Sequence, residues 1–393
     1  IGRALVLVCM DTNMAVYVHP NATTSVQEKV LDARQPDMGA VCGSPSSLHR
    51  FGRLQRDAME QAREQVANLM GAQASQVIFT SGGTEANNLL LKGLCIDAEV
   101  KRIALSEIEH MSLLEPAAKV NCVVDHIAVN DQALVTEDSL KQAIKKDTAL
   151  VSVMAANNET GAIQNIEKLA EIARESGTWF HTDASQIAGK MAFSFEQIGV
   201  HAMTLSAHKL YGPMGAGALI VDKQLPMHSL LQGGSQEKGL RAGTENVAAI
   251  VGFGMAAELA AQELVERADH VSVLRDVLEK ELMKFSVVKV FSHEARRLPN
   301  TLQFGVQGFD GETLLMELDR RGFAVSSGSA CTSGKTEPSH VLKAMAVPND
   351  LATSAIRVSL GRANTMVEVE RFIEAIQQIL GIKNSAVMMA ANL

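Results

Sequence analysis

The sequence contains few cysteines and few aromatic residues. Aromatics make up 4% of the 393 residues, and the cysteines are scattered and odd in number: Cys9, Cys42, Cys95, Cys122 and Cys331. None forms a Cys-x-x-Cys pair, which argues against a disulfide framework and against structural zinc. The histidines likewise have no ligand-like spacing, so no metal site is predicted. Scattered free cysteines are typical of a reducing compartment, and we therefore expect a cytoplasmic protein.

Long hydrophobic runs and runs of like charge are also missing. The longest apolar run near the start, residues 4–10, is too short to span a bilayer and lacks the flanks of a signal peptide. The net charge of −8 is spread along the chain, without a basic stretch that could bind nucleic acid. We therefore expect a soluble protein with no membrane partner and no direct nucleic-acid partner. Because Met14 directly precedes a strand-like run, residues 1–13 are expected to lie upstream of the natural start or to be foreign.

The chain does have length and a regular alternation of short apolar strands with helices. At 393 residues it exceeds one compact domain, so two domains are expected. The pattern predicts helices such as 53–70, 84–93 and 166–176, and strands at 77–80, 103–105, 149–154, 178–181 and 202–205. This order implies right-handed βαβ units and a mostly parallel, doubly wound α/β sheet.

The regular alternation of strands and helices ends near residue 255. Beyond it we predict one long helix over 255–285, strands at 287–291 and 300–304, and a last helix begun by a capping box of Thr365 and Glu368. The predicted domains are an N-terminal segment packing with the small domain (14–30), a large domain (31–259) and a small α+β domain (260–393).

A turn of small residues, Ser81-Gly82-Gly83-Thr84, follows the strand at 77–80, where a helix is expected to start. Small residues let a ligand approach the backbone, and a helix N-terminus offers free N–H groups and a positive dipole end to a phosphate. Taken alone, the segment is better explained as a tight turn with Ser and Thr as helix caps. It lacks the nucleotide-binding motifs Gly-Lys-Thr and G-x-G-x-x-G, so a nucleotide is not indicated.

Asp183 and Lys209 stand at or just beyond the ends of two further predicted strands. Ligands of open α/β sheets bind at these ends, although an acid there could simply cap the next helix. A lysine at such a position is unusual, and burial would lower its pKa, as Schiff-base chemistry requires. Pyridoxal phosphate (PLP) needs a phosphate anchor, a carboxylate facing its ring nitrogen and a lysine. The turn at 81–84, Asp183 and Lys209 are each weak evidence alone, but PLP needs all three groups. We therefore predict PLP as the cofactor.

Cys331 lies in a segment of small residues, Ser327-Gly328-Ser329-Ala330-Cys331-Thr332-Ser333-Gly334. Most free cysteines are buried small hydrophobes, and Cys95 and Cys122 look like that. A nucleophilic thiol is exposed and often lies in a segment of this kind. The alternative is a plain surface loop with an incidental cysteine.

Together these segments resemble the cysteine desulfurases of the NifS/IscS type, which are PLP enzymes of fold type I in the class V aminotransferase family. The resemblance covers nearly everything from Met14 to Ile379. It is carried by the motifs Asn21-Ala22-Thr23-Thr24, Ser44-Pro45-Ser46-Ser47-Leu48-His49, Gly83-Thr84-Glu85, Glu109-His110, Asn157-Asn158-Glu159-Thr160-Gly161, His181-Thr182-Asp183-Ala184, Ser206 to Pro213, Arg241-Ala242-Gly243-Thr244-Glu245-Asn246, Ser327 to Gly334, Glu337-Pro338-Ser339-His340 and Ile356 to Arg362. It implies the fold type I transferase architecture, with a mostly parallel seven-stranded sheet in the large domain.

The resemblance also implies a role for each site residue. Lys209 would form the Schiff base and move protons at Cα, His110 would stack on the ring, and Cys331 would accept sulfur. Asp183 would pair with the ring nitrogen and Gln186 with the ring hydroxyl. The phosphate would be held by Gly83, Thr84, Ser206 and His208, joined by Thr244 from a neighbouring subunit of a homodimer. The substrate would be bound by Asn158 and Arg357, and Asn158 would also contact the cofactor.

The implied activity converts L-cysteine to L-alanine and leaves a persulfide on Cys331. A mobile loop would carry it to a sulfur-acceptor or iron–sulfur scaffold protein, for iron–sulfur clusters or for other thio-cofactor and tRNA pathways. Four departures from the family pattern, none of which removes a catalytic group, are His19-Pro20, Ser44, Met214 and Ser235. Competing interpretations are a selenocysteine lyase, a class V aminotransferase that would not need Cys331, and a non-catalytic sulfur-relay partner.

Overall fold

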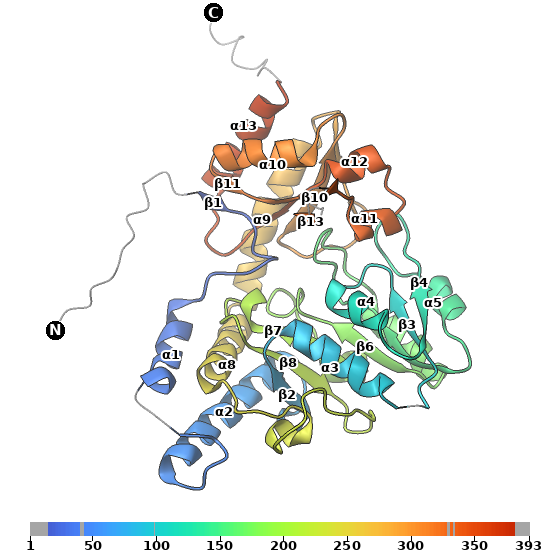
Figure 1. Cartoon of the computed structure of the whole chain (residues 1–393). Coiled ribbons are helices and arrows are strands. Elements are labelled where there is room, and N and C mark those ends of the chain that lie inside the picture. Colours follow the sequence, from blue (N-terminus) through green and yellow to red (C-terminus); the bar gives the residue numbers. More distant parts are fainter. Residues whose placement is uncertain (1–14, 40–42, 98, 328–330, 333–334, 382–393) are drawn as a thin grey trace, which may run out of the picture.

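The computed structural model describes residues 15–39, 43–97, 99–327, 331–332 and 335–381. Figure 1 shows a large lobe below and a smaller lobe above. The large sheet contains, in spatial order, β2 (Val77–Thr80), β8 (Gly217–Val221), β7 (Ala202–Ser206), β6 (Trp179–Asp183), β5 (Thr148–Ser152), β3 (Arg102–Ser106) and β4 (Val123–Ile127). Strand β8 is antiparallel to both neighbours, and the other neighbouring pairs are parallel. The predicted mostly parallel, seven-stranded α/β fold is confirmed.

Helices cover both faces of this sheet. On one face α2 (Arg50–Leu69), α6 (Ile166–Glu175) and α8 (Val247–Gln262) share a core with Phe79 of β2. On the other face α3 (Gly83–Cys95) and α4 (Met111–Ala117) share a core with the adjacent residue, Ile78. Since successive side chains of a strand point to opposite faces, a strand covered on both sides is mostly apolar. This is why most of the buried strands could be predicted from short hydrophobic runs.

The smaller sheet is antiparallel, in the order β12 (Ser326–Ser327), β15 (Ile356–Ser359), β10 (Thr301–Val306) and β9 (Val288–Val290). It shares a core with α9 (Leu264–Leu282), α10 (Gly311–Arg320) and α13 (Met366–Ile379). The capping box at the start of α13 is confirmed, because Thr365 and Glu368 each accept the other's backbone N–H. Strand β1 (Val16–Tyr17) pairs in parallel with β11 (Phe323–Ala324), so the N-terminal segment contacts this lobe.

The prediction of one helix over 255–285 is wrong. Helices α8 and α9 meet at Glu263 with a bend of 73°. The physical reason is that the two helices serve different cores: α8 packs in the large lobe and α9 in the small one. No single helix in the described ranges is long and apolar enough to span a membrane, and only this bent pair meets the criteria together. The domain boundaries at 30/31 and 259/260 stay predictions.

The remaining described elements lie outside the two main sheets and the helices named above. They are α1 (Glu28–Gly39), α5 (Glu137–Ala143), α7 (Phe195–Ile198), α11 (His340–Ala344), α12 (Asn349–Thr353), β13 (Cys331–Thr332), β14 (Lys335–Thr336) and the 3₁₀ turns Ala74–Gln76, Ala207–Lys209 and Gln236–Gly239.

Candidate active site

A cavity of about 630 Å³ opens beyond the carboxyl ends of the strands β2, β3, β5, β6 and β7. Parallel strands end at a common edge, so polar residues that follow different strands converge there. Ten of the predicted site residues line this cavity: Gly83, Thr84, His110, Asn158, Asp183, Gln186, Ser206, His208, Lys209 and Arg357. Their roles stay predictions, but the structure brings all ten together.

The turn after β2 leads directly into α3, which begins at Gly83. The first N–H groups of a helix have no acceptor within it, so those of Gly83 and Thr84 are available to an anion. A Cβ built on Gly83 would lie 3.2 Å from Ser185 Oγ and 3.5 Å from Ser206 Cβ, so a larger residue would intrude on this crowded corner. The turn is held by Glu85, whose carboxylate accepts from Ser81 N at 2.7 Å and from Arg241 Nε at 2.9 Å.

Asp183, the last residue of β6, is a buried carboxylate on the cavity wall. Its oxygens accept from Ser185 N at 2.9 Å and from Asn87 Nδ2 at 2.9 Å. Among the described residues no lysine or arginine forms a salt bridge with it. A buried carboxylate is stable when it meets a cationic or N–H partner, which a protonated ring nitrogen would supply.

A short relay joins Asp183 to His110. The amide of Asn87 also donates to Ser112 Oγ at 2.8 Å, and that hydroxyl lies 2.8 Å from His110 Nδ1. Since His110 Nδ1 also accepts from the Ser112 N–H, the proton of the neutral ring belongs on Nε2. Burial, opposed in part by Asp183, lowers the pKa of His110, which keeps the ring neutral.

Lys209 lies in the 3₁₀ turn that follows β7. Its Nζ donates to the carbonyl oxygens of Asn21 at 2.5 Å and Ala22 at 2.7 Å. Burial, followed by repulsion from Arg357, lowers the pKa of Lys209 to about 8, against an opposing attraction to Asp183. An amine with this pKa is partly neutral near pH 7, which a nucleophilic lysine requires.

Arg357 enters the cavity from the small lobe, on strand β15. Its Nη1 donates to Asn158 O at 2.9 Å, while its buried Nε has no hydrogen-bond partner in the described part of the chain. Burial lowers the pKa of Arg357, although Glu159 and Tyr17 oppose this effect. A buried guanidinium with an unused N–H suits the carboxylate of a small substrate.

The position of Cys331 is described only through its backbone. Strand β12, which precedes the cysteine segment, pairs with the arginine strand in the register Ser326↔Arg357. The cysteine itself belongs to β13, which pairs with β14. Its side chain and residues 328–330 and 333–334 lie outside the described part, as does the prediction that this loop is mobile. The segment nevertheless starts from a strand beside the cavity.

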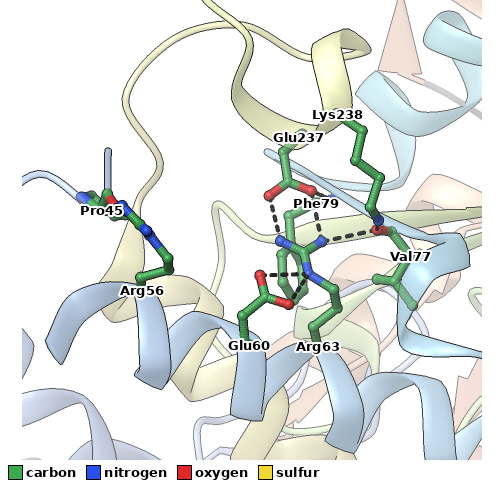
Figure 2. Close-up of polar contacts among 8 residues, drawn as sticks. All are labelled: Pro45, Arg56, Glu60, Arg63, Val77, Phe79, Glu237 and Lys238. Atoms are coloured by element: carbon green, nitrogen blue, oxygen red, sulfur yellow. Dashed lines mark hydrogen bonds and ion pairs between the residues drawn. The ribbon is translucent and has the colours of Figure 1, made fainter. Parts of the chain in front are cut away.

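Thr244 does not line the cavity of its own chain and is exposed. The segment that carries it starts from a turn at Glu237 and Lys238, and Figure 2 shows that this turn is anchored to α2 and β2. Arg63 forms a two-bonded ion pair with Glu237 at 2.8 and 2.7 Å, and Glu237 also accepts from Phe79 N at 2.7 Å. The next residue, Lys238, donates to Val77 O at 2.9 Å. These contacts hold Glu237 and Lys238 at φ of 44° and 60°, which is strained for residues other than glycine.

Three residues that sequence reasoning did not assign contact the site residues directly. Asn87 bonds Asp183, while Asn21 and Lys190 bond Gln186. Asn21 was visible within the Asn-Ala-Thr-Thr motif, and Asn87 stands four residues after Gly83, one turn into the helix. Lys190 gave no signal, because a lysine four residues after Gln186 is also typical of a solvated turn.

Comparisons with known proteins agree on one family. The model described as aminotransferase class-V matches residues 16–372. The cysteine desulfurase IscS of Dictyoglomus turgidum is 42% identical over 371 residues, which cover 93% of this chain and 94% of that protein. A solved NifS-like protein superposes with a TM-score of 0.88 at 37% identity, covering 94% of this chain and 100% of that one. The structure of SspA in complex with cysteine has a TM-score of 0.78 at 30% identity, covering 89% and 99%.

Proposed function

Because the chain belongs to the class-V aminotransferase family and to its cysteine desulfurases, we propose that it takes sulfur from L-cysteine with the residues of this cavity. The products are L-alanine and a persulfide on Cys331. The observation that carries the proposal is the meeting of Lys209, Asp183 and the Gly83 turn in one cavity, with Arg357 facing them from the other lobe.

The residues present fit PLP, the coenzyme that the family implies. Asp183 is a buried carboxylate without a cationic side-chain partner in the described ranges, and the free N–H groups at Gly83 and Thr84 suit a phosphate. Gln186 would face the ring hydroxyl, while Ser206 and His208 would complete the phosphate site. When bound, PLP supplies an electron sink that makes the Cα proton of an amino acid removable.

Side chains of the protein bind the substrate, move the protons and accept the sulfur. Arg357 and Asn158 hold the substrate carboxylate, and the neutral amine of Lys209 takes the Cα proton. The Cys331 thiolate attacks the substrate sulfur, so an S–S bond forms and the substrate C–S bond breaks. The electron pair stays on the carbon, which gains a proton and leaves as the methyl group of alanine. No outside oxidant is needed, because the persulfide sulfur and the methyl carbon share the redox change.

The test is incubation with L-cysteine and a reductant, scoring alanine and sulfide together. We expect equal amounts of both from the wild type. Cys331→Ser should lower both at least about 100-fold while keeping the visible absorption of lysine-bound coenzyme, because the thiolate is the nucleophile. Cys122→Ala, which removes a cysteine remote from the cavity, is the matched control. Full release of alanine and sulfide by Cys331→Ser would refute the role of this thiol in the desulfurase mechanism. Consumption of cysteine without alanine would favour an aminotransferase, and a marked preference for selenocysteine would favour a lyase.

A homodimer that completes the phosphate site is part of the proposal. Apolar side chains stay exposed at the end of α1 (Met38), just before α2 (Leu48) and in its first turns (Phe51 and Leu54). Gln55 Nε2 donates to Asp37 Oδ1 at 2.8 Å, so these two stretches lie side by side. Contiguous exposed apolar groups mark interaction surfaces, and a second copy of this chain is the partner we infer. The anchored segment with Thr244 borders α2 and would reach the neighbouring cavity.

Mixed dimers test this sharing of Thr244. One subunit carries Lys209→Ala and the other Thr244→Ala. If Thr244 serves the neighbour, the subunit with the intact lysine receives an intact threonine, and the mixed dimer keeps half of the wild-type activity with wild-type coenzyme affinity. If Thr244 serves its own subunit, that site shows the weak coenzyme binding of the pure Thr244→Ala protein, which contradicts the proposal.

The proposal also includes the protein that accepts the sulfur and the compartment in which the enzyme acts. We propose a sulfur-acceptor or iron–sulfur scaffold protein as the recipient of the persulfide, and the cytoplasm as the compartment, since a reactive thiolate needs reducing surroundings. Transfer of ³⁵S from labelled cysteine to captured acceptor proteins tests the first point, and cell fractionation tests the second.

A further inference from the structure

Behind the cavity wall lies a second lysine that the proposed reaction does not use. Lys190 Nζ donates to Gln186 Oε1 at 3.0 Å and to Asn21 Oδ1 at 3.2 Å. Both acceptors are neutral amide oxygens, and among the described residues no carboxylate forms a salt bridge with this ammonium. Burial, then repulsion from Lys209 and Arg357, lowers the pKa of Lys190 to about 7. These surroundings disfavour the charged form of Lys190, which indicates that the residue has a role at this position.

Its contacts determine the orientation of one amide. Gln186 Nε2 donates to the carbonyl oxygen of Asn21 at 3.0 Å, while its Oε1 accepts from Lys190. An ammonium can only donate, and a carbonyl oxygen can only accept. A flipped Gln186 would therefore set two acceptors against each other at Asn21 and, when Lys190 is protonated, two donors against each other at Lys190. The amide has one stable orientation, which leaves a second Nε2 hydrogen for a ligand.

Gln186 lines the cavity, and in the proposed function it faces the ring hydroxyl of PLP. We propose that Lys190 is a positioning residue that fixes the Gln186 amide with its N–H₂ group available to that ring oxygen. A donor at this place favours the ionised oxygen, and a carbonyl oxygen there would favour the protonated one. The inference rests on the proposed function for the identity of the ring, but its readout does not depend on turnover.

The experiment is a double-mutant cycle read by the absorption of the bound coenzyme as a function of pH. The four proteins are the wild type, Lys190→Met, Gln186→Ala and the double variant, all as coenzyme-loaded full chains. Loss of the fixed donor should raise the pH midpoint of the visible band by about one unit in Lys190→Met. In the Gln186→Ala background the same change should cause little further shift, because Lys190 acts through that amide.

Control variants separate this role from plain stabilisation and from plain charge. Lys190→Arg keeps a charged donor and should restore the wild-type midpoint, and Lys168→Met removes an exposed lysine and should leave the midpoint unchanged. If Lys190→Met does not load coenzyme, Lys190→Gln is read in the same cycle. An unchanged midpoint, or an equal shift in both backgrounds, overturns the proposal. A wild type that binds the coenzyme on lysine but makes no alanine would instead refute the proposed function and leave this test readable.

Discussion

His19 Nδ1 lies 3.4 Å from Nη2 of Arg357, the guanidinium that faces the proposed substrate site. Burial, reinforced by repulsion from Arg357 and Lys209, lowers the pKa of His19 to about 4. The ring is therefore neutral near pH 7 and supplies no counter-charge to Arg357. His19 belongs to one of the four departures noted in the sequence, and this departure has an electrostatic consequence at the site itself.

His19→Asp should weaken substrate binding. The new carboxylate would form a salt bridge with Arg357 and compete with the substrate carboxylate for the same guanidinium. We expect KM for L-cysteine to rise by about tenfold, since roughly 1.4 kcal/mol of binding free energy would be lost, with kcat changed less. Steady-state kinetics measure this split, and His126→Asp on the exposed part of β4 is the control. An unchanged or lower KM would contradict the argument that a carboxylate at position 19 competes for Arg357.

Glu237→Gln tests the anchor of the Thr244 segment. Removing the charge leaves buried Arg63 with only the more exposed Glu60 as a counter-charge, beside a backbone that is already strained. We expect the free energy of unfolding to fall by about 3–5 kcal/mol. Coenzyme affinity should fall with it, because the same segment carries Arg241 to Glu85. Denaturant titration and coenzyme dissociation measure the two effects. The matched control, Glu137→Gln in the exposed pair with Lys141, should cost less than about 1 kcal/mol.

Much of the architecture could be predicted because burial leaves a direct trace in the sequence. The strands that end at Asp183 and Ser206 are almost fully buried and begin with apolar residues, although they also contain buried polar residues such as His181 and Thr204. Lys209 was recognisable because a lysine directly after such a strand has an unusual environment. The edge strand β4 was not predicted, since it includes the polar residues Asp125 and His126.

Contacts between distant parts of the chain could not be predicted from local sequence patterns. Asn21 donates its N–H to Ser359 Oγ at 3.0 Å and its side-chain amide to Thr301 Oγ1 at 2.8 Å, both in the small lobe. The same residue accepts hydrogen bonds from Lys190 and Lys209 in the large lobe. Local periodicity carries no information on partners about 300 residues away, so this junction emerges only from the folded chain. The break at Glu263 was hidden for the same reason.

Glu109 should make stability depend on pH. Burial, opposed by the Met154 N–H and reinforced by Asp183, raises the pKa of Glu109 to about 8 from a model-compound value of 4.5. A folded-state pKa above the unfolded one means that the folded protein binds more protons. Its contribution to stability is therefore complete below about pH 4.5 and is lost as pH rises through about 8.

Glu109→Gln keeps the acceptor for Met154 N but cannot ionise. We expect the coenzyme-free variant to be more stable than the wild type at pH 8, by on the order of 2 kcal/mol, and the difference to shrink towards pH 5. Denaturant unfolding at several pH values measures both curves. Asp131→Asn, which changes an exposed acid, is the control. Parallel curves for Glu109→Gln and the wild type would mean that Glu109 is already ionised in the fold.

Lys209 should capture the coenzyme with a pH dependence unlike that of an ordinary lysine. With a pKa of about 8, the neutral amine is already about a tenth of the population at pH 7, whereas a normal lysine reaches that fraction only near pH 9.5. The rate at which coenzyme-free protein gains the visible band should rise with pH and level off above about 8. A small free amine mixed with PLP controls for the titration of the coenzyme.

Two variants fix the sign of this effect. Asp183 raises the pKa of Lys209, so Asp183→Asn should move the midpoint of the rate profile to lower pH. Arg357 lowers it, so Arg357→Met should move the midpoint to higher pH. Opposite shifts from two residues on different lobes would mean that the amine responds to both charges across the cavity. A wild-type rate that keeps rising to pH 10 would contradict a buried, partly neutral Lys209.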